Sequence, residues 1–186
     1  MTETRAYHHG DLRRALLAAA LEAIEEVGPA ALSLRDLARR AGVSHAAPTH
    51  HFGDKAGLLT ALAAQGFDRL AQTLTGTGGD LLEAGVAYVD FAVTHRAYFE
   101  VMFRPELYRA DDAELIAARE RAGAALRSGV AGLPGAGAPA DTERDALAAW
   151  SIAHGFATLW LAGALPSRVG DNPREAARTV LRRLTS

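Results

Sequence analysis

Apolar residues recur three or four positions apart along almost the whole chain, as they do on one face of an α-helix. Strand-like alternation of apolar and polar residues bounded by turns does not occur. The pattern therefore predicts an all-α fold of about nine helices. The first helix is expected over about residues 10–27, ended by Gly28-Pro29. Its apolar stripe consists of Leu12, Leu16, Ala19, Ala20, Ile24 and Val27.

Capping residues mark the starts of the next helices. Ser33 precedes a short helix over 34–40, and Gly42 ends it. We expect Ser44 to cap a second short helix that stops at Gly53. Asp54 is expected to cap a long helix that continues to about residue 75.

Three later helix starts each combine a capping residue with an acid at the third helical position: Asp80, Asp111 and Asn172. Glycine and proline at 132–140 predict a surface loop. The remaining helices are therefore expected at about 80–94, 96–103, 111–131, 141–163 and 173–185.

The glycine-rich run at 75–79 is a candidate domain boundary, because glycine inside a helix costs about 1 kcal/mol. A chain of 186 residues is long enough for two domains. We expect a smaller N-terminal domain over 1–56, a connecting helix over 55–75 and a larger C-terminal domain over 76–186.

The stretch "AGVSHAAPTHHFGDK", residues 41–55, joins the two short helices of the N-terminal domain. Gly42 lets the chain turn, and Val43 is expected to pack inward. Two short helices joined by such a turn form a helix-turn-helix. Early residues of its second helix reach base edges in the major groove of DNA, while its first helix crosses the backbone.

The segment "SLRDLARRAGVSHAAPTHHFGDKAGLL", residues 33–59, resembles the DNA-binding domain of the TetR family of bacterial transcriptional regulators. The resemblance extends over about residues 8–65 and includes the turn, the phenylalanine, the polar cap and the lysine. It implies an N-terminal three-helix DNA-binding domain and a larger helical domain that binds a ligand and forms a homodimer. The DNA-contacting residues that it implies are Arg35, Ser44, His45, Ala46, Thr49, His50 and Lys55.

Two positions depart from the family pattern. Thr49 stands where the family very often has tyrosine, so a phosphate anchor is shortened. Pro48 lacks the N–H that an intrahelical bond needs and pushes Ala47 from helical angles, so the reading helix is expected to begin near residue 48. Ala46 and Ala47 offer only methyl contacts, such as to a thymine methyl.

Composition narrows the possible functions. The net charge of −2 provides no overall basic field, so DNA binding must depend on a local patch. No cysteine is present, and the histidine spacing does not fit a helical zinc site, so we expect neither a metal nor a cofactor. Catalytic and phosphate-binding motifs are also missing, which makes an enzyme improbable. His8 and His9 are candidates for an exposed N-terminal arm near DNA, alongside Arg5, Arg13 and Arg14.

Aromatic residues gather in two stretches of the larger domain, at 87–103 and 150–160. Such residues at helical spacing are usually core, yet an apolar pocket with a few polar groups is also the usual form of a small-molecule site. Trp150 and His154-Gly155 additionally resemble the Trp-His-Gly signature of one TetR subtype. The candidate effector-binding residues are Tyr88, Phe91, His95, Phe99, Met102, Phe103, Trp150 and His154.

A dimer is expected because one short reading helix buries too little surface for specific binding. Two half-sites about 34–36 Å apart match a palindromic operator. By resemblance to the family, the last two long helices form the interface. Its candidate residues are Ala148, Ile152, Leu159, Val180, Leu181 and Leu184.

The expected function is a cytoplasmic, ligand-responsive repressor that a small, largely apolar molecule releases from double-stranded DNA. No apolar run is long enough to cross a membrane and no secretory signal is evident, so no membrane partner is expected. Two rivals stay open. One is a helical small-molecule binding protein with weakened operator specificity, and the other is a helical enzyme with a hidden histidine pair.

Overall fold

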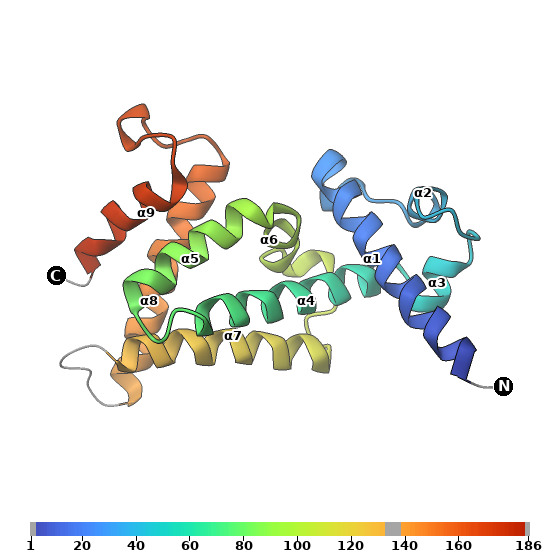
Figure 1. Cartoon of the computed structure of the whole chain (residues 1–186), viewed down its shortest axis with the longest axis horizontal. Helices are drawn as coiled ribbons and strands as arrows, with labels where there is room; N and C mark the ends of the chain where they lie inside the picture. The colour runs from blue at the N-terminus through green and yellow to red at the C-terminus, as the bar shows by residue number, and fades with distance from the viewer. Residues whose placement is uncertain (1–2, 133–138, 185–186) are drawn as a thin grey trace. The chain divides into compact units, whose positions relative to one another are not determined.

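The computed structural model describes residues 3–132 and 139–184, and over these residues it contains nine α-helices, three short 3-10 helices and no strand (Figure 1). The predicted all-α class is therefore confirmed. The α-helices are α1 (Glu3–Ala31), α2 (Leu34–Arg40), α3 (Ala47–Phe52), α4 (Lys55–Thr75), α5 (Leu81–Thr94), α6 (Arg96–Met102), α7 (Ala113–Ala131), α8 (Pro139–Leu161) and α9 (Pro173–Leu181). The 3-10 helices are η1 (Pro105–Leu107), η2 (Ser167–Val169) and η3 (Arg182–Leu184).

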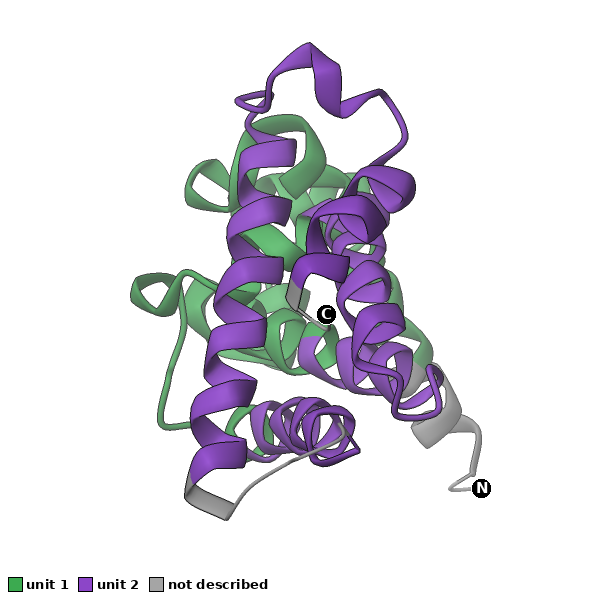
Figure 2. Cartoon of the chain, turned by 90° about the vertical axis from the view of Figure 1, so that its left-hand side faces the viewer, with its two compact units in different colours: residues 1–66, 97–116 green, residues 67–96, 117–186 purple. Residues whose placement is uncertain are grey.

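The chain divides into two compact units, coloured separately in Figure 2. Unit 1 consists of residues 1–66 and 97–116, and unit 2 of residues 67–96 and 117–186. Helices α4 and α7 contribute to both units, and the division of α4 falls between Gly66 and Phe67. Unit 1 therefore contains α1–α3 together with α6, which follows them much later in the sequence.

Helix α1 is interrupted at Gly28, as its sequence predicts. Gly28 has φ 75° and ψ 162°, so the helix ends there and one further turn begins at Pro29. Leu16, Ala20 and Ile24 are buried, but Val27 is 52% exposed and does not belong to the core. Val27 immediately precedes this kink, at the end of the apolar stripe.

Three of the six predicted caps, at Asp54, Asp80 and Asn172, form a side-chain hydrogen bond, whereas Ser33 lies at the N-cap position of α2 without one. The Asp80 carboxylate accepts a hydrogen bond from the Glu83 amide at 2.9 Å, and the Asn172 side chain accepts from the amides of Arg174 and Glu175. The predicted cap at Asp111 is wrong. The neighbouring Asp112 accepts from the Leu115 amide at 3.0 Å, and α7 begins one residue later, at Ala113.

Unit 1 has a core that includes leucines from α1, α2 and α4. Leu16 and Leu37, from α1 and α2, are completely buried. Leu58, Leu59 and Leu62 of α4 are also completely buried. Helix α4 thus contributes several completely buried leucines to the core of unit 1.

Unit 2 is organised around α5, which packs against α8 and α9. Gly85 of α5 leaves room for Leu181 of α9, whose Cδ1 atom lies 2.8 Å from where a glycine Cβ would be. Two ion pairs flank this contact and join the same helices, Glu83 to Arg178 and Asp90 to Arg174. Within residues 3–132 and 139–184, none of the helices is long and apolar enough to span a bilayer.

Replacing Leu62 by alanine is expected to lower the free energy of unfolding by about 2–5 kcal/mol, because it removes a completely buried side chain and leaves a cavity. Ile116 is 51% exposed in the same unit, so I116A is a matched control and should change stability by less than about 0.5 kcal/mol. Urea denaturation followed by circular dichroism measures both. Equal losses for the two variants would contradict this description of the core.

Candidate nucleic-acid interface

Helices α2 and α3 of unit 1 are joined by a closed turn. Gly42 has φ 64°, a left-handed conformation that glycine adopts readily. The Val43 amide donates to the carbonyl of Ala38 at 3.0 Å, and the Gly42 amide donates to the carbonyl of Arg39. These bonds end α2 and direct the chain into the following turn, which gives the helix-turn-helix that the sequence predicts.

Helix α3 begins at Ala47, with Ala46 at the capping position. The predicted Ser44 cap is therefore wrong. Pro48 fits only into the first turn of a helix, where an amide needs no intrahelical partner, so the helix starts beyond the reach of the Ser44 side chain. Ser44 instead accepts a bond from the Ala47 amide with its main-chain carbonyl, at 3.0 Å. The predicted start near Pro48 agrees with the structure.

One face of α3 is anchored and the other is open. Pro48 and Phe52 are buried, while Ala47 and His51 are partly covered. Of the residues proposed to contact DNA, Lys55 is partly covered. The others are exposed: Arg35, Ser44, His45, Ala46, Thr49 and His50.

Arg13 of α1 helps to anchor α3 by contacting the ring of Phe52. Its guanidinium carbon lies 5.4 Å from the centroid of the Phe52 ring, a cation–π contact. Sequence reasoning placed Arg13 only near DNA, because nothing in the local pattern pairs it with a ring 39 positions later. The side-chain contacts of Arg5, His8 and His9 in the expected N-terminal arm lie outside the described residues.

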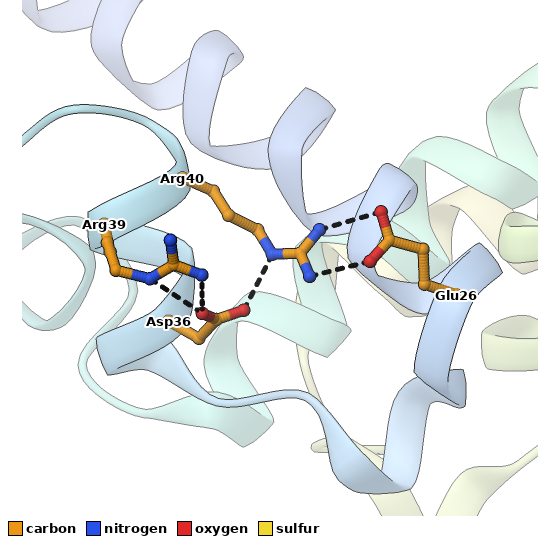
Figure 3. A network of polar contacts seen from close by, with 4 residues as sticks. All are labelled: Glu26, Asp36, Arg39 and Arg40. Atoms are coloured by element: carbon orange, nitrogen blue, oxygen red, sulfur yellow. Dashed lines mark hydrogen bonds and ion pairs between the residues drawn. The ribbon is translucent and has the colours of Figure 1, made fainter.

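A network of charged side chains fixes α2 against α1 (Figure 3). Arg40 donates to both carboxylate oxygens of Glu26, at 2.9 and 2.7 Å, and to Asp36 at 2.7 Å. Asp36 also accepts from Arg39 at 2.6 Å. Hydrogen bonds from Arg40 lower the pKa of both Glu26 and Asp36, and Arg39 lowers that of Asp36 further.

Three charged residues surround the junction between α3 and α4. The Lys55 ammonium donates to the carbonyl of Ala30, which joins the start of α4 to the end of α1. Asp54 caps α4, accepting from the Gly57 amide at 2.8 Å, and this bond lowers the pKa of its carboxyl, as does nearby Arg109. Arg109 pairs with Asp54 at 2.9 Å, a contact that sequence reasoning missed.

The proposed effector residues fall into two groups. In unit 2, Tyr88 lies between Trp150 and His154: the Trp150 indole donates to the Tyr88 oxygen at 3.2 Å, and that oxygen lies 2.8 Å from His154 Nδ1. Burial raises the pKa of the Tyr88 phenol and lowers that of His154, so both groups favour their neutral forms. Phe91 and His95 lie beside each other, with ring centroids 5.1 Å apart.

The other three effector candidates belong to unit 1. Phe99 and Met102 are buried in α6, and the Phe99 ring is 5.1 Å from that of Phe103. The sequence put all eight candidates in one C-terminal set, but the structure divides them between the two units, five in unit 2 and three in unit 1.

The proposed dimer residues are mostly exposed. Ile152 and Leu159 of α8 are 39% and 47% exposed, Val180 of α9 is 41% exposed, and Ala148 is also exposed. Leu181 is buried against α5 and is not available to a second chain. The Leu184 side chain lies outside the described residues.

Known proteins share both parts of this arrangement. Residues 16–62 match the family model described as bacterial regulatory proteins of the TetR family, and residues 81–184 match a tetracyclin repressor-like C-terminal domain. A protein of unknown function from Rhodococcus sp. RHA1 is 36% identical, with 96% of this chain and 95% of that chain covered and a TM-score of 0.79.

Two further proteins are similar to this chain, one in sequence and one in fold. The HTH-type transcriptional regulator BetI of Ectopseudomonas mendocina is 51% identical over 49 residues, 26% of this chain and 25% of BetI. The chain thus matches about a quarter of the length of this curated relative. AibR, crystallised with isovaleryl coenzyme A and operator DNA, has the same fold: 18% identity, a TM-score of 0.66, and 94% of this chain and 98% of AibR covered.

The helix-turn-helix and the helical C-terminal domain define a transcriptional regulator. The chain belongs to the TetR family of bacterial regulatory proteins. Its likeness to the Trp-His-Gly subtype stays a prediction.

Replacing Arg40 by methionine is expected to destabilise the protein at neutral pH, because it removes the shared partner of Glu26 and Asp36. Both carboxyl groups have a lowered pKa in the folded chain, so their contribution is present above their unfolded pKa of about 4 and is lost as the pH falls further. The stability difference between wild type and R40M should therefore shrink below about pH 4.

Urea denaturation at a series of pH values measures this difference. Arg14 is a suitable control because it pairs with Asp11 within α1 and is 82% exposed, so R14M should have little effect at any pH. If R40M loses the same free energy of unfolding at every pH, the ion pairs of Arg40 with Glu26 and Asp36 contribute nothing to stability.

Proposed function

We propose that this regulator is a homodimeric repressor that binds a palindromic operator in double-stranded DNA and is released by a small, largely apolar effector. One observation carries the proposal: α3 is anchored by Pro48 and Phe52 and leaves His45, Thr49 and His50 exposed beside it. A helix anchored on one face and open on the other can enter the major groove.

The roles of individual residues follow from their chemistry. His45, Thr49 and His50 have donors or acceptors that can reach base edges, and Ala46 supplies a methyl contact. Arg35 and Lys55 are suited to backbone phosphates by their charge, and Ser44 by its hydroxyl. Contacts to phosphate position the protein, and contacts to bases select the sequence.

Dimerisation would bring two reading helices to one operator. The exposed apolar residues of α8 and α9 support this part of the proposal: Ile152, Leu159 and Val180. Ala148 lies on α8 one turn before Ile152, and a small residue there permits close approach of a second helix. We leave Leu181 out of the interface because it is buried within unit 2.

An effector can act only by binding the DNA-competent and DNA-incompetent forms with different affinity. We propose that it binds in unit 2 beside Tyr88, Trp150 and His154, and that α6, which directly follows α5 in the chain, shifts relative to α1 and α4 when it binds. The neutral tyrosine and histidine favour an uncharged partner. AibR, whose fold is similar, was crystallised with both a coenzyme A ester and DNA.

Such a protein would work in the cytoplasm, without a membrane partner, a cofactor or catalysis. The alternative is a small-molecule binding protein with weakened operator specificity. It is favoured by Ala46, Ala47 and Thr49, which leave few groups that can discriminate between bases. Compounds that bind tightly without changing DNA affinity would support this alternative over the repressor.

Replacing Lys55 by alanine should weaken binding to all DNA sequences and reduce the slope of log affinity against log salt by about one unit, because one phosphate contact is lost. H45A should instead change the preferred sequence. Fluorescence anisotropy with labelled duplexes at several salt concentrations measures both effects. R144A, a charge loss on α8, is the control. Wild-type behaviour of both K55A and H45A would show that the reading helix is misassigned.

Replacing Ile152 by aspartate should convert the dimer to a monomer, because a charge would have to be buried in an apolar interface. Sedimentation equilibrium gives the mass directly. Ile116 of α7 is also apolar and exposed, so I116D is the matched control and should remain dimeric. A dimer of I152D as stable as the wild-type dimer would rule out this face.

A further inference from the structure

Residues 97–112 comprise most of α6 and its connection to α7. They lie along the first half of α4, all within unit 1. At one end, the Tyr98 hydroxyl donates to Gln65 at 3.1 Å. Beside it, a Cβ atom on Gly66 would lie 2.6 Å from the Met102 sulfur, so α6 packs directly on the backbone of α4. This end of the segment is therefore fixed by close packing.

Further along, the segment stays bound to α4. The Arg109 amide donates to the Thr60 hydroxyl oxygen at 3.0 Å, and Thr60, only 5% exposed, donates in turn to the carbonyl of Ala56. Within the segment, the Tyr108 hydroxyl donates to the Met102 carbonyl at 2.8 Å. The backbone of Arg109 is thus held one to two turns from the start of α4.

The side chain of Arg109 reaches the junction of α3 and α4. Its guanidinium pairs with Asp54 Oδ2 at 2.9 Å, while Asp54 Oδ1 accepts from the Gly57 amide. The guanidinium also lies over two glycines: a Cβ on Gly57 would be 3.3 Å from it, and one on Gly53 would be 3.9 Å from it. A Cβ on residue 57 would crowd this guanidinium and would clash with the Phe52 carbonyl oxygen, 2.0 Å away.

We propose that Arg109 is a positioning residue for DNA binding, which holds the α3–α4 junction through Asp54 and thereby fixes the orientation of the reading helix. The predicted effect of Arg109 on DNA binding rests on the proposed function, but its contact with the α3–α4 junction can be measured without DNA. Arg109 lies 55 residues from Asp54 in the sequence and outside the 16–62 segment that matches the DNA-binding family model.

The size of the effect follows from the exposure of the pair. The side chains of Arg109 and Asp54 are 51% and 59% exposed, and ion pairs of this kind contribute little to stability. We therefore expect a local change. In R109M the amide hydrogens of residues 53–58 should exchange with solvent about two- to fivefold faster than in the wild type, and the midpoint of unfolding should be nearly unchanged.

The experiment combines hydrogen exchange with a double-mutant cycle. The wild type is compared with R109M, D54N and the double variant. The asparagine of D54N keeps an oxygen that can still accept from the Gly57 amide. R104M is the matched control, since Arg104 lies in the same segment but pairs with neighbouring Glu106. R109K, which keeps the charge, should recover part of the protection.

DNA binding is measured on a duplex that the full wild-type chain selects from a random pool. R109M should lose about two- to fivefold in affinity per subunit, and little or nothing further in the D54N background, because the two residues act through one contact. An equal loss in both backgrounds, with unchanged exchange, would overturn the proposal in favour of a direct phosphate contact. Unchanged exchange and affinity in R109M would also overturn it.

Failure of the proposed function gives a different result. If the wild type selects no duplex, the regulator proposal fails, while faster exchange of residues 53–58 in R109M but not in R104M still supports the hold on the junction. If the wild type selects a duplex and R109M behaves like R104M in both measurements, only the Arg109 proposal fails.

Discussion

The arrangement of the DNA-binding region depends on the burial of Pro48 and Phe52. Helix α3 has six residues, too few to be stable alone, so its direction is fixed by what it packs against. Pro48 and Phe52 provide this packing, and Arg13 lies over the Phe52 ring. The exposed residues of α3 that are proposed to read DNA, Thr49 and His50, are oriented by that anchor.

The surrounding polar contacts extend the same constraint to neighbouring helices. Arg40 holds α2 on α1 through Glu26, and Lys55 joins α4 to the end of α1 through the Ala30 carbonyl. Arg109 reaches the junction from the segment that follows α6. These are exposed or half-exposed contacts, each of small energy, so their value lies in fixing the angles between short helices.

The sequence predicted features that depend on neighbouring residues and missed those that depend on distant ones. Asp80 and Asn172 were identified as caps because a cap and the amides it binds lie within three residues. Two consecutive aspartates at 111 and 112 offer the same capping group, and the acid at residue 114 favoured the wrong one. At Ser44, the pattern gave too little weight to the proline four residues later.

The candidate sites show the same limit. Tyr88, Trp150 and His154 were recognised as one set from residue type, but their hydrogen bonds join positions more than sixty apart and no local pattern encodes them. The pairing of Arg109 with Asp54 has no sequence signal at all. Burial of Leu181 was missed because its partner, the space above Gly85, is created by a different helix.

Selection of binding sites from a pool of random duplexes, followed by footprinting with the purified full chain, tests the central claim most directly. The account predicts enrichment of a palindrome and protection of two half-sites about 10 base pairs apart, at protein concentrations well below those of non-specific binding. Uniform, weak binding to all duplexes, without enrichment of any sequence, would contradict it.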